Sequence, residues 1–469
     1  MMRNALTIIL VTACLTGCTM VPRYARPAPP IPAGWPTGAA YKADDSPTGP
    51  PAADVGWREF YADERLQKVI GFALANNRDL RIAALHIERA RGLYRIQRAA
   101  LLPEVEASGG LTEEKYPAYP PLTEKPLILK QYDAGPGISS WEIDFFGRLR
   151  SLKASALEQY LATGQALRSA QISLMAEVAS VYLAYAADGE NLKLAQSTLE
   201  ARLATYNLIQ RRFDVGASSA LDLRQAQTTV EAARVDVAGY TRLVALDENA
   251  LSLLVGAPVP SGLLPAELDA VTPPKDISAG LSSEPLLRRP DILQAENQLK
   301  AANANIGAAR AAFFPRIALT TSIGTSSMEL SDLFKTASGV WAFAPQITVP
   351  IFDAGSRWAS LKVAKADRDI YLAQYEKAIQ TAFREAADAL AQRGTVGDQI
   401  AAQESLVQAS QDTYSLSNAR YMKGIDSYLA VLDAQRSLYA ARQGLISLRL
   451  ARLNNLVALY KILGGGGRQ

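Results

Sequence analysis

The feature that most constrains this 469-residue chain is an internal duplication. Pro103 is matched by Pro315, 212 residues later, and Gly216 is matched by Gly424, 208 residues later. Two further pairs at these offsets are Asp79 with Asp291 and Gly256 with Gly464. A period of this size is far longer than the ~20–50 residues of solenoid repeats. The pattern therefore predicts one duplicated domain.

Each copy contains two segments in which apolar and polar residues alternate with a period of two. In the first copy these are residues 105–112 and 141–145, and in the second copy they are residues 317–323 and 341–349. Segments of roughly 8–11 residues with this period fit a soluble sheet or a tilted, lipid-facing strand. Taken alone, the alternation favours the soluble sheet.

The connections between these segments suit a barrel better. The proline-rich tract at 116–126 and the polar stretch at 326–338 resemble the longer outward loops of outer-membrane barrels. Four strands cannot close a barrel, and open edges are not tolerated in lipid. The chain must then oligomerise: two copies would give 8 strands and a filled interior, and three would give 12 strands with room for a lumen.

Long helices follow each strand pair. The runs from Leu149 to about Phe213 and from Trp358 to about Tyr421 contain no proline, and each could reach ~95 Å if continuous. The returning segments carry heptads: Leu223, Ala226, Val230, Ala233, Val237, Tyr240 and Val244 in the first copy, and Val431, Ala434, Leu438, Ala441, Leu445 and Leu448 in the second. A 3.5-residue period predicts left-handed coiled-coil pairing.

The amino terminus has the pattern of an export signal. Arg3 precedes a short apolar stretch that is too short to span a membrane, and the segment ends in Leu-Thr-Gly-Cys at Cys18. This resembles a bacterial lipobox, so we expect a lipid on Cys18; an ordinary signal peptide is the alternative. Together with the absence of an internal apolar span, the anchor favours the barrel. The prolines that follow predict an extended arm.

Composition points away from an enzyme. The chain has 49 basic and 46 acidic side chains, which is too balanced for a nucleic-acid surface. His86 is its only histidine, and Cys14 and Cys18 are its only cysteines. Neither a histidine-based triad nor a multi-histidine or multi-cysteine zinc site can be built from these residues. We expect no cofactor and no metal apart from the lipid.

Several segments carry a resemblance to a known family. They are Arg289-Pro290-Asp291 with Glu296, Ile306–Arg310 with Phe314-Pro315, Gly424 with Leu432–Gln435, and Ala458–Lys461 before Gly464. In these the chain resembles the TolC-type outer-membrane efflux proteins, in the NodT/OprM-like lipoprotein branch. The resemblance implies a homotrimeric 12-stranded transmembrane β-barrel, with four strands per chain, continued by a long coiled-coil α-helical barrel.

The resemblance also implies a function. Such a chain is the outer-membrane exit duct of a tripartite efflux system, and its partners are a periplasmic adaptor and an inner-membrane transporter of the resistance–nodulation–division type. A type I secretion duct is one alternative, and a structural lipoprotein that spans the periplasm is another. The transported substrate stays open.

The two interhelical turns are the implied functional sites. Adaptor docking would fall on the turn residues Val215, Gly216, Ala217, Lys423, Gly424 and Ile425. The candidates for a periplasmic gate are Asp426 and Asp433, followed by Tyr421 and Asp222. Three-fold symmetry would turn an inward carboxylate into a ring of three. Asp426 stands where TolC has an arginine, and Ala430 where it has an aspartate, so we expect a bare carboxylate ring; helix capping by these aspartates is the alternative.

These inferences divide the chain into segments. We assign residues 1–17 to the signal peptide, 18–60 to the lipidated arm and 61–264 to the first repeat. Residues 265–284 form an equatorial linker, and 285–463 form the second repeat. The glycine-rich residues 464–469 are expected to be a flexible tail.

Overall fold

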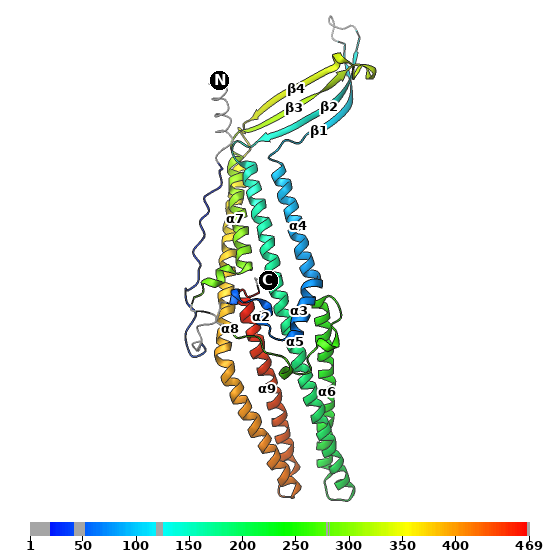
Figure 1. Cartoon of the computed structure of the whole chain (residues 1–469), viewed down its shortest axis with the longest axis vertical. Coiled ribbons are helices and arrows are strands. Elements are labelled where there is room, and N and C mark those ends of the chain that lie inside the picture. Colours follow the sequence, from blue (N-terminus) through cyan, green and yellow to red (C-terminus); the bar gives the residue numbers. More distant parts are fainter. Residues whose placement is uncertain (1–18, 42–51, 119–124, 278–279, 281, 467–469) are drawn as a thin grey trace. The chain divides into compact units, whose positions relative to one another are not determined.

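The computed structural model describes residues 19–41, 52–118, 125–277, 280 and 282–466. Long helices and one four-stranded sheet make up most of this part of the chain (Figure 1). The fold divides into two compact units, each containing segments of both copies. Unit 1 comprises Met1–Ala28, His86–Gly164 and Gln294–Tyr375, and unit 2 comprises Pro29–Leu85, Gln165–Leu293 and Glu376–Gln469.

The sheet lies in unit 1 and joins the two copies. Its strands are β1 (Glu106–Tyr116), β2 (Leu127–Ile143), β3 (Arg316–Ser327) and β4 (Gly339–Thr348), in that order and all antiparallel. The central pair, β2 with β3, brings a strand of each copy together. This order leaves β1 and β4 as the edges of the sheet. The predicted outward loop at 116–126 lies partly outside the described residues.

Strand β2 differs from its prediction at 141–145, because it begins already at Leu127 and is 17 residues long. Gly135, Pro136 and Gly137 interrupt the alternation there and have the composition of a turn. In the sheet, Pro136 lies opposite Ala107. A Cβ atom on Gly135 would lie 2.4 Å from the carbonyl oxygen of Ile323, so glycine is required where β2 and β3 approach closely.

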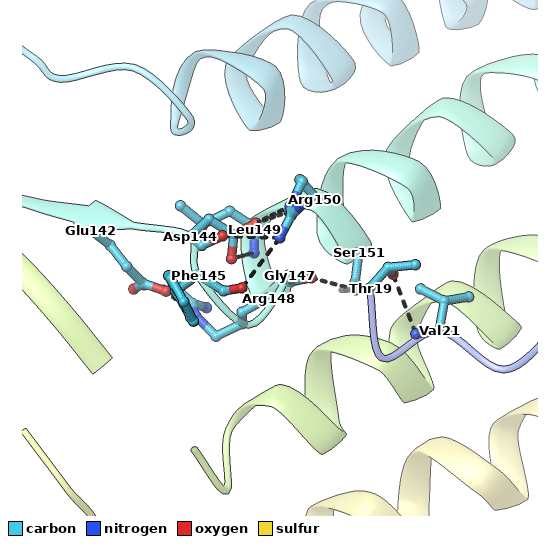
Figure 2. Close-up of polar contacts among 10 residues, drawn as sticks. All are labelled: Thr19, Val21, Glu142, Asp144, Phe145, Gly147, Arg148, Leu149, Arg150 and Ser151. Carbon is cyan, nitrogen blue, oxygen red and sulfur yellow. Dashed lines mark hydrogen bonds and ion pairs between the residues drawn. The ribbon is translucent and has the colours of Figure 1, made fainter. Parts of the chain in front are cut away.

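Each strand pair leads into a long helix through an aspartate cap. Figure 2 shows Asp144, whose carboxylate accepts hydrogen bonds from the backbone amides of Leu149 (3.0 Å) and Arg150 (2.8 Å) at the start of α5 (Arg148–Asp214). In the second copy Asp353 accepts from the amide of Arg357 (3.0 Å) at the start of α8 (Ser356–Met422). Both caps stabilise the amino-terminal end of a helix.

The extended arm lies along α7 (Pro290–Ala311) within unit 1. The Asn303 amide donates to the carbonyl oxygen of Pro22 (2.8 Å), and Arg310 donates to that of Met20 (3.3 Å). Farther along, Glu296 is ion-paired with Arg26 and with Lys300. The predicted extended arm is free of helix over residues 19–41, but a short 3-10 helix (Ala52–Asp54) and α2 (Trp57–Phe60) interrupt it before residue 60. The lipidation site Cys18 lies outside the described residues.

Unit 2 has the larger apolar core. It is built by α2 (Trp57–Phe60), α3 (Glu64–Asn76) and the equatorial segment around Val271, together with α5, α6 (Ala220–Val255), α8 and α9 (Tyr428–Ile462). Tyr460 is buried there and donates its hydroxyl to the carbonyl oxygen of Val55 (2.7 Å). Arg289 joins three elements by donating to Asp291, Glu385 and the carbonyl oxygen of Ile462.

The predicted long helices are present, since α5 and α8 each have 67 residues. Four heptad positions of α6 are buried, and so are four of α9. Among the described residues, α5 is the one helix long and apolar enough to cross a membrane, although 56% of its apolar window is buried. That burial is typical of a core helix, because apolar residues of α5 such as Val178, Tyr182 and Leu183 lie in the core of unit 2.

The carboxyl-terminal glycines differ from the predicted flexible tail. Gly464 to Gly466 form turns in unit 2, and a Cβ atom on Gly465 would lie 2.2 Å from the ring of Tyr460. Close packing against this buried ring is the physical reason for their order. Residues 467–469 lie outside the described part. Helix α4 (Arg78–Ala99), which precedes β1, carries the exposed His86.

Candidate functional site

The two interhelical turns, residues 215–219 and 423–427, end the long helices α5 and α8 in the same way. Gly216 has φ 75° and Gly424 has φ 70°, both left-handed. The amide of Gly216 donates to Phe213 (2.9 Å) and that of Ala217 to Arg212 (2.7 Å), and the second turn repeats both bonds. This is the Schellman arrangement, which satisfies the last carbonyls of a helix. Gly216 and Gly424 therefore have a structural role in ending α5 and α8, independently of any contact with a partner.

The next helix begins differently in the two turns. In the first, Ser219 accepts from the amide of Asp222 (3.0 Å) and Asp222 accepts from the amide of Ser219, which completes a capping box at the start of α6. Helix α9 begins after Ser427, whose side chain makes no capping bond. The third residue of α9 is Ala430, which has no carboxylate to accept a hydrogen bond from the amide of Ser427.

Asp426 is not the bare carboxylate that the sequence suggested. Arg420 donates from Nε (2.5 Å) and from Nη2 (3.0 Å) to its two carboxylate oxygens. This two-pronged ion pair holds the pKa of Asp426 below its usual value. The expectation was wrong for a physical reason: the chain reverses between the two residues and brings the last turn of α8 against the turn residue.

The other gate candidates make different contacts. Asp433 is exposed on α9, with Arg436 at 3.7 Å. Tyr421 is half-buried and its ring lies 5.3 Å from that of Tyr428. Asp222 caps α6, as the alternative prediction held. A gating role for all four aspartate and tyrosine candidates stays a prediction.

A small apolar cluster joins the two hairpins within unit 2. Its buried members are Ile209, Leu223, Ala226, Tyr428, Val431 and Leu432, and Tyr206, Tyr414 and Tyr421 pack against it. The guanidinium of Arg212 lies 5.6 Å from the centre of the Tyr421 ring. Because α5, α6, α8 and α9 all contribute, a change at one turn can reach the other through direct packing.

The candidate docking residues are exposed on both turns. Val215 is 78% exposed and Ile425 is 59% exposed, and Gly216, Ala217, Lys423 and Gly424 are exposed as well. Apolar side chains in water at a turn favour a contact with another protein. Adaptor docking at these residues stays a prediction.

Sequence reasoning missed two groups in unit 2. Arg420 was one, since its partner lies six positions away and matches no helical spacing. The other is a pair of carboxyl groups, Asp188 on α5 and Asp247 on α6. Burial is the main cause that raises the pKa of Asp247 to about 6, and the negative charge of Asp188 adds to it. Among the described residues, no group forms a hydrogen bond with the buried Oδ2 atom of Asp247. The sequence did contain one sign of this carboxyl pair: the residue that matches Asp247 in the second copy is Asn455, which has no charge.

Comparisons with known proteins agree with this architecture. The family model described as outer membrane efflux protein matches residues 69–257 and 281–465, one segment in each copy. The toluene efflux pump outer membrane protein TtgC and the antibiotic efflux pump outer membrane protein ArpC, both of Pseudomonas putida, are each 49% identical over 99% of this chain and 96% of their own length. The solved open state of the MtrE outer membrane channel of Neisseria gonorrhoeae is 40% identical, covers 96% of this chain and 98% of its own, and has a TM-score of 0.85.

These relatives confirm the predicted fold class, a trimeric TolC-type channel with a helical barrel and four strands per chain. They also confirm the outer membrane as the location and efflux as the role, in a family of channels. The two matched segments, the four-stranded sheet and the paired long helices together place the chain in the outer membrane efflux protein family.

Proposed function

We propose that this chain is the exit duct of a tripartite efflux system, passively conducting small molecules across the periplasm and the outer membrane. The observation that carries this function is the open sheet with an apolar face. On β4, Trp341, Phe343 and Ile347 alternate on one face and are each more than 60% exposed. Such a sheet is stable in lipid only when other chains close its edges. Three chains give 12 strands and a lumen.

The helical turns are the proposed contact points for the rest of the system. A periplasmic adaptor would pack against the exposed residues of both turns, and an inner-membrane transporter would supply the energy. In a trimer each acidic residue at the tip occurs three times around the axis. Asp426, Asp433, Tyr421 and Asp222 would then control entry of the cargo, with Arg420 holding Asp426.

The proposed cargo is small and organic. Relatives named for toluene and for antibiotic efflux support this class, since each matches nearly the whole chain. A lipid on Cys18 would hold the arm to the membrane, because the arm runs along α7 directly after that residue.

A conductance measurement tests the duct. The purified full-length protein in a planar bilayer should show channels whose conductance rises when Arg420→Gln loosens the tip. If neither the native protein nor this variant conducts, the duct proposal fails. In cells lacking their own channel, expression should lower the accumulation of toluene or an antibiotic. Export of a polypeptide with no change in such accumulation would favour type I secretion instead.

A further inference from the structure

Helices α4 and α7 occupy matching positions in the two copies, and each ends shortly before a strand of the sheet. Helix α4 ends at Ala99, ahead of β1 at Glu106, and α7 ends at Ala311, ahead of β3 at Arg316. Their portions next to the strands both belong to unit 1. The two helices can therefore be compared position by position.

On α7 one face holds the arm. The residues of this face follow alternating spacings of four and three, which places them in one row along a helix: Glu296, Lys300, Asn303, Gly307 and Arg310. A Cβ atom on Gly307 would lie 2.5 Å from the side chain of Val21, so the arm presses directly on the helix. Figure 2 shows Thr19 and Val21 beside Ser151 of α5.

On α4 the matching face is basic. The positions 212 residues earlier are Ala84, Glu88, Arg91, Arg95 and Arg98. The three arginines are exposed, and within the described ranges of the chain their guanidinium groups make no hydrogen bond or ion pair. Helix α4 holds six arginines against two acidic residues, whereas α7 holds two basic and two acidic residues.

The arginine row of α4 matches the part of α7 that holds the start of the described arm. Arg310 binds the carbonyl of Met20, two residues from Cys18, and Arg98 is the match of Arg310. If Cys18 carries a lipid, the leaflet surface is within a few residues of this level. Ile96 (70% exposed) and Leu102 (71% exposed) flank Arg98 with apolar side chains. Basic and apolar side chains mixed in this way are typical of a membrane interface.

We propose that Arg91, Arg95 and Arg98 bind the phosphate groups of anionic phospholipids in the periplasm-facing leaflet of the outer membrane. This inference rests on the proposed lipid anchor for its position. A guanidinium group donates two parallel hydrogen bonds to a phosphate, and the apolar neighbours contact the acyl chains. Each arginine near an anionic surface contributes about fivefold in affinity. The arginine row thus gives α4, in the first copy, a lipid contact at the face where α7, in the second copy, holds the arm.

The test uses the full-length, lipidated trimer in detergent micelles with added phosphatidylglycerol or phosphatidylcholine. Bound lipid is counted by native mass spectrometry. The native protein should retain phosphatidylglycerol in preference to phosphatidylcholine. The triple variant R91Q/R95Q/R98Q should lose this preference by about tenfold or more. The control R224Q/R234Q/R242Q removes the same charge from exposed arginines of α6 and should keep it.

Equal retention of phosphatidylglycerol by the native protein and the triple variant would overturn the proposal. So would dissociation of the variant into monomers with an unchanged lipid preference, because the arginines would then pair with a neighbouring copy. Channel conductance, measured on the same preparations, separates this failure from a failure of the duct function.

Discussion

The turn between α5 and α6 and the turn between α8 and α9 have the same backbone but different side-chain partners. Gly216 and Gly424 close both with the same pair of hydrogen bonds. Asp222 then caps the helix that follows the first turn, whereas in the second Asp426 binds Arg420 of the preceding helix. A cap stabilises its own helix end, but an exposed ion pair depends on pH and salt. The two copies thus share the backbone geometry of the turn but differ in its side-chain interactions.

The largest expected effect on local stability comes from the shared glycines. Gly216→Val and Gly424→Val each force a β-branched residue into left-handed backbone, which should cost about 1–2 kcal/mol. Hydrogen exchange of the turn amides, read by mass spectrometry, measures this cost locally. Alanine at the same positions serves as the milder control. Markedly unequal losses at the two turns would show that their geometries are not equivalent.

A smaller effect should follow from exchanging the capping residue. Asp222→Ala removes half of the capping box and should lower protection at the start of α6 by about 0.5–1 kcal/mol. Ala430→Asp supplies the missing carboxylate at α9 and should raise protection there. Ala430→Ser is the matched control without a carboxylate. Unchanged exchange in the Asp variant would mean that the second turn cannot adopt the box.

The next prediction concerns Asp247 and its match Asn455, which donates to the carbonyl oxygen of Ala389 (2.9 Å). The raised pKa of Asp247, about 6, means that its ionisation destabilises the fold, and the penalty grows as the pH rises from about 4 to about 6. Asp247→Asn should therefore increase protection of the α5–α6 hairpin at pH 7. Solvent screening keeps the gain below about 1 kcal/mol.

The same measurement at pH 4 should show little difference between Asp247→Asn and the native protein, because the carboxyl group is then protonated in the folded state. Asp188→Asn is the companion variant, since it removes the neighbouring charge and should lower the pKa of Asp247. A gain that is equally large at both pH values would exclude titration of this pair as its cause.

The smallest effect on stability, but a clear effect on conductance, is expected at Asp426. The pKa of Asp426 is lowered, mainly by the hydrogen bonds from Arg420. The ion pair therefore stabilises the fold fully at pH values above the ordinary pKa of an aspartate, and this stabilisation is lost as the pH falls through the lowered pKa of Asp426. Asp426→Asn should leave hydrogen exchange nearly unchanged and raise single-channel conductance at neutral pH. The native protein should approach that conductance only in acid.

The charge-swapped variant Arg420→Asp with Asp426→Arg is the control for the ion pair. It should restore the low conductance of the native protein, while either single change opens the tip. Failure of the swap to restore it would assign gating to a contact other than this pair, for example the ring of Asp433 residues.

Much of the fold could be predicted from local patterns. The long helices α5 and α8 begin and end within two residues of their expected limits, because an uninterrupted run without proline has few alternatives to a helix. Most of β2 was missed, because Gly135 and Pro136 look like a turn in isolation. Only the neighbouring strands show that glycine is needed there for close approach.

The candidate site was predictable in place but not in its interactions. The glycines, the heptads and the repeat located both turns. The partner of Asp426 could not be read from the chain, since Arg420 reaches it only after the backbone reverses. The ordered glycines at 464–466 were unpredictable for a related reason, because the ring of Tyr460 that they pack against lies in the core.

The duplication, the helix lengths, the position of the turns and the family could all be read from the amino-acid sequence alone. These depend on periodicity and on residues such as proline and glycine, whose effect on the backbone is local. Which charges meet, where the arm lies and which matching face stays uncovered became clear from the folded chain. Those outcomes depend on side chains brought together from distant parts of the chain, and local propensity contains no information about such distances.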